Sequence, residues 1–121
     1  MPGLRDVLAR LLAIPGVRAA VLVGREGLPI EMAGRGDQRF LESLGAHGAS
    51  ALGVTEALGH ELGGGRPIAA LLEYEDALVS VDPLGDYAAV VTLAESAASL
   101  ASVRQVIYAG RDEILRQLDM R

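Results

Sequence analysis

The chain has 121 residues and a formal net charge of −5 at pH 7, and it contains neither cysteine nor lysine. This length fits one domain, so we expect residues 1–121 to form a single one, without disulfides or thiolate metal sites. The acidic balance argues against a nucleic-acid partner, which needs clustered basic residues. The apolar runs are no longer than strands and no leader pattern opens the chain, which predicts a soluble, cytoplasmic protein with no direct membrane insertion.

A helix and a hairpin are predicted first along the chain. Leucine and valine recur at helical spacing over residues 3–13, and Pro15-Gly16 interrupts the pattern, so we expect a short amphipathic helix there. The stretches 17–23 and 28–33 are rich in apolar, strand-type residues and flank turn residues at 24–27. That arrangement predicts a β-hairpin.

A long central helix is predicted over residues 37–62. Asp37 is a suitable N-cap, a broad apolar stripe follows it, and glycines at 63–65 end the pattern. Three short strands are predicted after it, at 67–74, 77–81 and 87–93. An amphipathic helix then begins near residue 96 and continues to the end of the chain.

The predicted element order is therefore α-β-β-α-β-β-β-α, which belongs to the α+β class. The last three strands are joined by short connections, and short connections link antiparallel neighbours. We expect one five-stranded antiparallel sheet with helices packed on it in three α/β/α layers.

Few groups in the sequence suit catalysis. Without lysine there is no P-loop, and neither histidine lies in a zinc-ligand spacing. His47 has Ser43 and Ser50 within helical reach, but helices bring such pairs together routinely, and catalysis needs an orienting acid as well. The acidic runs at 73–76 and 82–86 lack the calcium-loop pattern and are interpreted as solvated turns. We predict no catalytic, cofactor-binding or metal-binding residues, and a protein that binds other chains and is not an enzyme.

The central helix contains glycines where a helix disfavours them. They are Gly45, Gly48, Gly53 and Gly59. Each costs about 1 kcal/mol relative to alanine, but small residues let another backbone approach closely. Two interpretations stay open: the helix packs on the chain's own sheet, or it packs on a second copy of itself. Both can hold at once, because one helix can use different faces for the two contacts. The nearly all-apolar strand at 67–74 indicates burial on both faces or a subunit contact.

The order and spacing of these elements resemble the roadblock/dynein light chain family over about residues 4–118. The resemblance is carried by a Pro-Gly-Val entry into an apolar strand, a charged-Gly-hydrophobic hairpin, the small-residue helix and a late apolar strand. Apart from the helix, these segments are residues 15–17 with 19–23, 25–30 and 86–91. The resemblance implies a roadblock/longin-like fold and a homodimer in which central helices pack together and third strands pair edge to edge. It also implies partnership with a Ras-like small GTPase, which the bacterial gliding-protein type of this family regulates.

Two sets of contact residues follow from these expectations. The predicted dimer interface comprises Leu44, Gly45, His47, Gly48, Ala51, Leu52, Thr55, Leu58, Ile68, Ala70, Leu72 and Tyr74. The predicted GTPase contacts comprise Arg35, Arg39, Glu42, Ser43, Ala46 and Ser50.

Two modes of stimulation are open if the chain activates GTP hydrolysis. Arg35 or Arg39 could be inserted in trans, or the GTPase's own switch loops could be reshaped. We favour the second, because the family resemblance does not imply an arginine finger. The alternative function is a structural adaptor whose binding does not depend on nucleotide.

Overall fold

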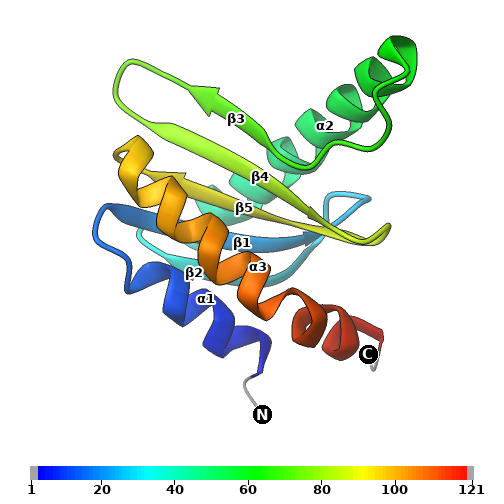
Figure 1. The fold of residues 1–121 in the computed structure, drawn as a ribbon. Coiled ribbons are helices and arrows are strands. Elements are labelled where there is room, and N and C mark those ends of the chain that lie inside the picture. Colours follow the sequence, from blue (N-terminus) through cyan, green and yellow to red (C-terminus); the bar gives the residue numbers. More distant parts are fainter. Residues whose placement is uncertain (1–2, 120–121) are drawn as a thin grey trace.

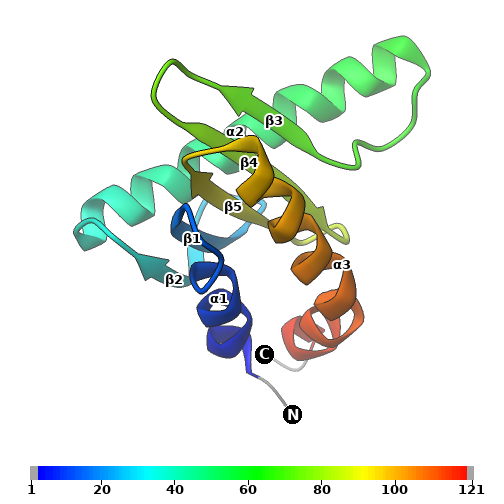
Figure 2. The same ribbon diagram turned by 60° about the vertical axis from the view of Figure 1, so that its left-hand side comes forward.

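The computed structural model describes residues 3–119 and has the predicted element order (Figure 1). The elements are α1 (Leu4–Leu12), β1 (Val17–Gly24), β2 (Pro29–Gly34), α2 (Gln38–Leu62), β3 (Ala70–Glu73), β4 (Leu78–Leu84), β5 (Ala88–Ala94) and α3 (Ala97–Asp119). The strands form one five-stranded antiparallel sheet in the order β2-β1-β5-β4-β3. Helices α1 and α3 cover one face and α2 covers the other (Figure 2), which confirms the three-layer α+β fold.

The centre of the sheet is apolar on both faces because two layers of helices cover it. Along β1, Ala20 and Leu22 face α1 and α3, whereas Val21 and Val23 face α2. β5 lies between β1 and β4 and shows the same alternation. Short aliphatic side chains at these positions let helices approach the sheet closely from both sides.

Helix α2 carries the chain from the β2 edge of the sheet to the β3 edge and begins and ends as predicted. The Asp37 carboxylate accepts a hydrogen bond from the Phe40 backbone N–H at 2.9 Å. Gly63 ends the helix with φ 65°, in the left-handed region that favours glycine. In both ribbon views the last turns of α2 extend beyond the edge of the sheet (Figure 1 and Figure 2).

Two predicted strand boundaries are wrong. β3 spans Ala70–Glu73 and not 67–74, because only this segment pairs with β4. β4 continues to Leu84 because its second half pairs with β5. Asp82, interpreted above as part of a solvated turn, therefore lies in a central strand and is only 4% exposed. The turn between β4 and β5 is confined to residues 85–87.

The last helix begins at Ala97, close to the predicted start, and is described to Asp119. Its predicted continuation over residues 120–121 lies outside the described residues. Within residues 3–119, no helix is both long and apolar enough to cross a lipid bilayer.

Candidate interaction surfaces

Helix α2 lies close to the sheet on its inward side. A Cβ atom on Gly48 would lie 2.3 Å from Cγ2 of Val91, and one on Gly45 would lie 2.8 Å from Cγ1 of Val21. Leu52 is fully buried in the same cluster. The glycines therefore serve the chain's own packing, and these three helix positions, predicted to meet a second copy, are covered by the sheet.

A second side of α2 is mostly apolar and largely uncovered. Val54, Leu58 and Leu62 recur every four residues and are 71%, 53% and 73% exposed. Helical geometry puts four other predicted interface residues on or beside this row. We call the whole set the apolar stripe of α2: Leu44, His47, Ala51, Val54, Thr55, Leu58 and Leu62. Val54 and Leu62 were missing from the predicted interface, although their spacing from Leu58 is a usable signal.

His47 is held against its own helix. Its Nδ1 lies 2.9 Å from the Ser43 carbonyl oxygen and 3.2 Å from the Ser43 hydroxyl. The contact with Ser43 raised from the sequence is thus present, and it is a pairing within one helix. Across residues 3–119, no three His, Cys, Asp or Glu residues are grouped so that they could hold a metal ion.

β3 forms one edge of the sheet and pairs only with β4 within the described part of the chain. Leu71 and Tyr74 are largely exposed, as is Ile68 just before the strand. Ala70 and Leu72, which were also predicted at the interface, are partly buried. A free edge presents unpaired backbone N–H and C=O groups, which makes it a template for another strand.

The third side of α2 faces the β1–β2 turn and forms a shallow hollow of about 400 Å³. The hollow is lined by Arg25, Glu26, Gly27, Leu28, Ala46, Ala49, Ser50 and Gly53. Gly27 has φ 94°, which glycine adopts without strain, and this lets the turn pass directly over Ala46. The sequence pattern of the helix could not reveal the contribution of the turn, because the turn comes from a separate segment.

The other predicted GTPase contacts continue from this hollow toward the beginning of α2. Arg35 and Arg39 are exposed and form no ion pair with any residue of 3–119. Glu42 accepts a hydrogen bond from the Gln38 amide at 2.9 Å, and Ser43 is exposed. We call this side the outer surface of α2: the hollow together with Arg35, Arg39, Glu42 and Ser43. Most of the two predicted residue sets thus lie on different sides of one helix.

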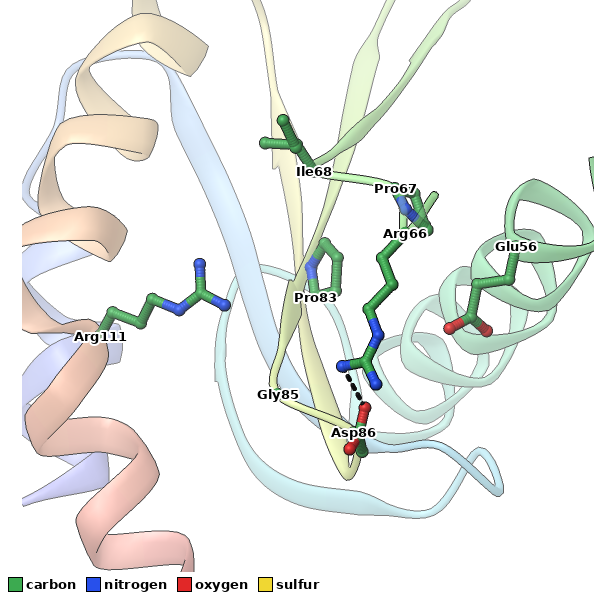
Figure 3. Close-up of a pocket in the computed structure, with 8 residues that line it drawn as sticks. All are labelled: Glu56, Arg66, Pro67, Ile68, Pro83, Gly85, Asp86 and Arg111. Atoms are coloured by element: carbon green, nitrogen blue, oxygen red, sulfur yellow. Dashed lines mark ion pairs between the residues drawn. The ribbon is translucent and has the colours of Figure 1, made fainter. Parts of the chain in front are cut away.

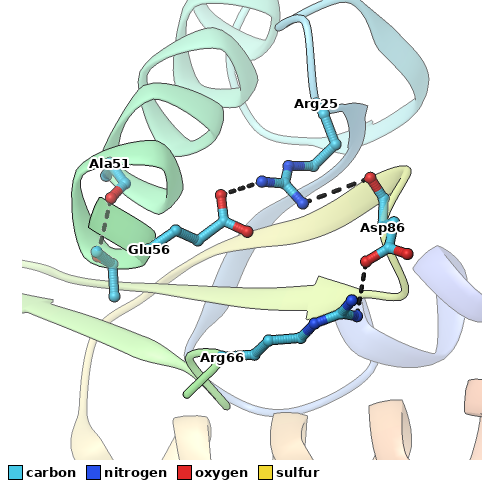
Figure 4. Close-up of polar contacts among 6 residues, drawn as sticks. Arg25, Ala51, Glu56, Arg66 and Asp86 are labelled. Carbon is cyan, nitrogen blue, oxygen red and sulfur yellow. Dashed lines mark hydrogen bonds and ion pairs between the residues drawn. The ribbon is translucent and has the colours of Figure 1, made fainter. Parts of the chain in front are cut away.

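Ion pairs fasten the β1–β2 turn to α2 and to the neighbouring loops (Figure 4). Arg25 forms an ion pair with Glu56 of α2 and donates to the Asp86 carbonyl oxygen at 3.4 Å. Arg66, just before β3, lies 2.7 Å from the Asp86 carboxylate. The Arg66–Asp86 pair is exposed, and such pairs add only about 0.2–1 kcal/mol, whereas Arg25 and Glu56 are partly buried. Through Glu56 and Asp86, Arg25 connects the β1–β2 turn to α2 and to the β4–β5 turn.

A separate cavity of about 200 Å³ adjoins these ion pairs (Figure 3). Arg111 of α3 points toward it from one side, and Arg66, Glu56 and Asp86 line the other. Two arginines and two carboxylates balance in charge, and the three groups on that second side are already in ion pairs. The lining therefore does not favour a charged ligand.

Comparison with known proteins places this arrangement in a family. The Roadblock/LC7 domain model matches residues 4–94, which is more than half of the chain. A search of curated protein sequences gave no significant match.

Solved structures with the same fold cover almost the whole chain. A Roadblock/LC7 domain from Streptomyces avermitilis is 21% identical with a TM-score of 0.80, over 94% of this chain and 99% of that one. The gliding protein MglB of Thermus thermophilus is 22% identical with a TM-score of 0.83, over 100% and 96%. MglB of Myxococcus xanthus is 20% identical with a TM-score of 0.82, over 99% and 100%. With its matching domain model and its α-β-β-α-β-β-β-α fold, the chain belongs to the Roadblock/LC7 domain family.

Proposed function

We propose that this chain is a homodimeric roadblock module that binds and regulates a Ras-like small GTPase. The observation that carries the proposal is that α2 has two free sides of different chemistry, the apolar stripe and the outer surface. The first suits a second copy of the chain. The second, with exposed arginines and hydroxyl groups, suits a partner with a polar surface.

The dimer is supported by two neighbouring features. The apolar stripe exposes the large side chains of Val54, Leu58 and Leu62 to water. Contiguous apolar patches of this kind mark contact sites. The free edge of β3 can pair with the same strand of a second copy, which joins two five-stranded sheets into one. A two-fold axis brings both features together in a self-complementary interface.

The GTPase assignment rests on family membership together with the outer surface. Membership supports the class of partner, because the roadblock resemblance implies a Ras-like GTPase. The hollow beside the β1–β2 turn offers a recess with exposed polar groups at its margin, including Ser50. The ion pair and the hydrogen bond of Arg25 hold this recess in shape before a partner arrives, which lowers the cost of binding.

We expect regulation to act through the GTPase's own switch loops and not through an inserted arginine. Replacing Arg35 and Arg39 together by alanine should then leave any stimulated GTP hydrolysis largely intact. Loss of stimulation in a variant that still binds would show that one of these arginines acts directly.

The binding test uses small GTPases from the same genome, each loaded with GDP or with a non-hydrolysable GTP analogue. Calorimetry or surface plasmon resonance should detect binding that prefers one nucleotide state. Ser50→Arg, in the hollow, should weaken it at least about tenfold, which corresponds to about 1.4 kcal/mol. Gln105→Arg, exposed on α3 at the opposite face, is the matched control and should not.

Each outcome of that test has a meaning. Preference for one nucleotide state supports GTPase regulation. Equal affinity for both states favours the alternative, a structural adaptor that works independently of nucleotide. Failure of every GTPase to bind in either state overturns the proposal.

A further inference from the structure

Three buried polar side chains lie together beneath α3, in the face of the sheet that is otherwise aliphatic. Ser80 and Asp82 of β4 and Thr92 of β5 are each no more than 5% exposed. Ser80 is directly opposite Thr92 in the strand register, and Asp82 is two residues further along the same face. Leu78 and Leu84 flank the group on β4 and pack into the α1 and α3 core.

The group is not satisfied by hydrogen bonds. Oγ of Ser80, Oδ2 of Asp82 and Oγ1 of Thr92 are buried and have no hydrogen-bond partner among residues 3–119. A buried polar atom without a partner destabilises the arrangement that buries it, since the same atom is hydrated when exposed. The cost applies to the docked position of α3 and is recovered when α3 moves away.

The charged and titratable groups around Asp82 are few. Burial raises the pKa of the Asp82 carboxyl, whereas the nearby Ser80 hydroxyl and the Arg104 guanidinium of α3 oppose this rise. The hydroxyl acts on the carboxylate without reaching normal hydrogen-bond geometry. Arg104 is itself shared with Tyr108, whose hydroxyl accepts a hydrogen bond from it at 3.1 Å.

Helix α3 is the element that seals this group from water. It packs against β4 and β5 and inserts Leu100, Val103 and Ile107 into the core on that face. We propose that α3 is a pH-sensitive cover, docked tightly on β4 and β5 when the Asp82 carboxyl is protonated and loosely when it is charged. Opening exposes the aliphatic face of the two strands, so the cover controls access to an apolar surface that is separate from α2.

The direction of the pH effect follows from linkage. The folded chain binds the Asp82 proton more tightly than the open state does, because the pKa is raised only while α3 is docked. The added docking stability is complete below the ordinary carboxyl pKa. It is lost as the pH rises from there through the raised pKa, and it does not change further above it.

Hydrogen exchange of backbone amides, measured by NMR on the full chain between pH of about 4 and about 8, tests the proposal. The hydrogen-exchange protection factor of the α3 amides is divided by that of the α2 amides. Helix α2 lies on the opposite face of the sheet and serves as the internal reference. The ratio should fall with rising pH, by up to about tenfold per pH unit across the window, and then level off. A ratio that is constant over the whole range overturns the proposal.

Three variants separate the titration from simple packing. Asp82→Asn should hold the ratio near its low-pH value at every pH. Thr92→Val removes an unpartnered hydroxyl at nearly constant volume, so it should raise protection of α3 while keeping the pH dependence. Arg104→Gln, an exposed change that does not threaten folding, should enlarge the fall in the ratio. An unchanged pH profile in both Asp82→Asn and Arg104→Gln contradicts the proposal.

Discussion

Glycine at position 48 of α2 is required by the valine beneath it. Val91 is β-branched and lies in a central strand, so its methyl groups cannot turn away from an added Cβ atom at 2.3 Å. Gly48→Ala should therefore destabilise the fold by about 1–3 kcal/mol, despite alanine's higher helix propensity. Urea denaturation followed by circular dichroism measures this change.

Gly53 provides the matched control, because it lies in the same helix with nothing within 4 Å of an added Cβ atom. Gly53→Ala should stabilise the fold by about 0.5–1 kcal/mol, since only the helix propensity changes. If both substitutions shift stability in the same direction, the close approach of α2 to the sheet at Gly48 is wrong.

The buried Asp82 carboxyl should make the free energy of unfolding depend on pH differently in the parent chain and in the variant Asp82→Asn. Because burial raises the pKa of Asp82, folding at neutral pH carries a cost for this carboxyl, which is ionised freely in the unfolded chain, and asparagine does not have that cost. Asp82→Asn should thus be more stable than the parent at pH 7, and this advantage should shrink as the pH falls below the raised pKa. Paired urea titrations at several pH values give the difference, and an advantage that does not vary with pH would count against a buried titrating carboxyl.

Single residues differ in how far the sequence predicts them. Asp37 and Gly63 act through the backbone of their own helix, so local pattern alone located both caps. Asp82 was interpreted as solvated because acidic residues surround a Pro-Leu-Gly segment, yet its pairing with β5 is a long-range property. The role of Gly48 was left open between two partners, because helical periodicity shows which residues share a face and not what covers that face.

At the scale of elements, α2 presents two free sides that its sequence distinguishes only in part. If the apolar stripe contacts a second copy of the chain, a charged side chain placed on it should weaken that contact. Leu58→Asp should raise the dimer dissociation constant at least about tenfold, since a carboxylate would lose its water in the interface. Multi-angle light scattering over a dilution series follows the mass directly.

Ala57→Asp is the control, because Ala57 is exposed on α2 but points away from the stripe. Both changes introduce the same charge into adjacent exposed positions, so both should leave the helix content by circular dichroism unchanged. A parent chain that remains monomeric at micromolar concentration, or equal effects of the two variants, would contradict the assignment of the stripe to a second copy.

Strand boundaries were less predictable than strand existence. All five strands were found, because short apolar or alternating runs between turn residues mark them locally. β3 is shorter than its apolar run because it has a neighbour on one side only, and Pro67 has no N–H to donate. β4 is longer than predicted because β5 pairs with it as far as Leu84. Its Asp82 and Pro83 had indicated a turn instead.

At the scale of the whole molecule, the β3 edge of the sheet and the apolar stripe of α2 are both uncovered in the described part of the single chain. The free β3 edge leaves backbone groups unpaired, and the apolar stripe leaves more aliphatic surface in water than the rest of α2. If a second copy covers both, the folded state gains stability from association, and the free energy of unfolding depends on protein concentration.

This coupling predicts a thermal midpoint that moves with dilution. A tenfold lower protein concentration should reduce the midpoint by roughly 2–5 °C, because association contributes about 1.4 kcal/mol less per decade for each dimer, or about 0.7 kcal/mol for each chain, and a chain of this size shifts by a few degrees per kcal/mol. Differential scanning calorimetry over two decades of concentration measures it. Leu58→Asp should remove the dependence while Ala57→Asp keeps it. A midpoint that is the same at every concentration would mean that the folded single chain does not depend on a second copy.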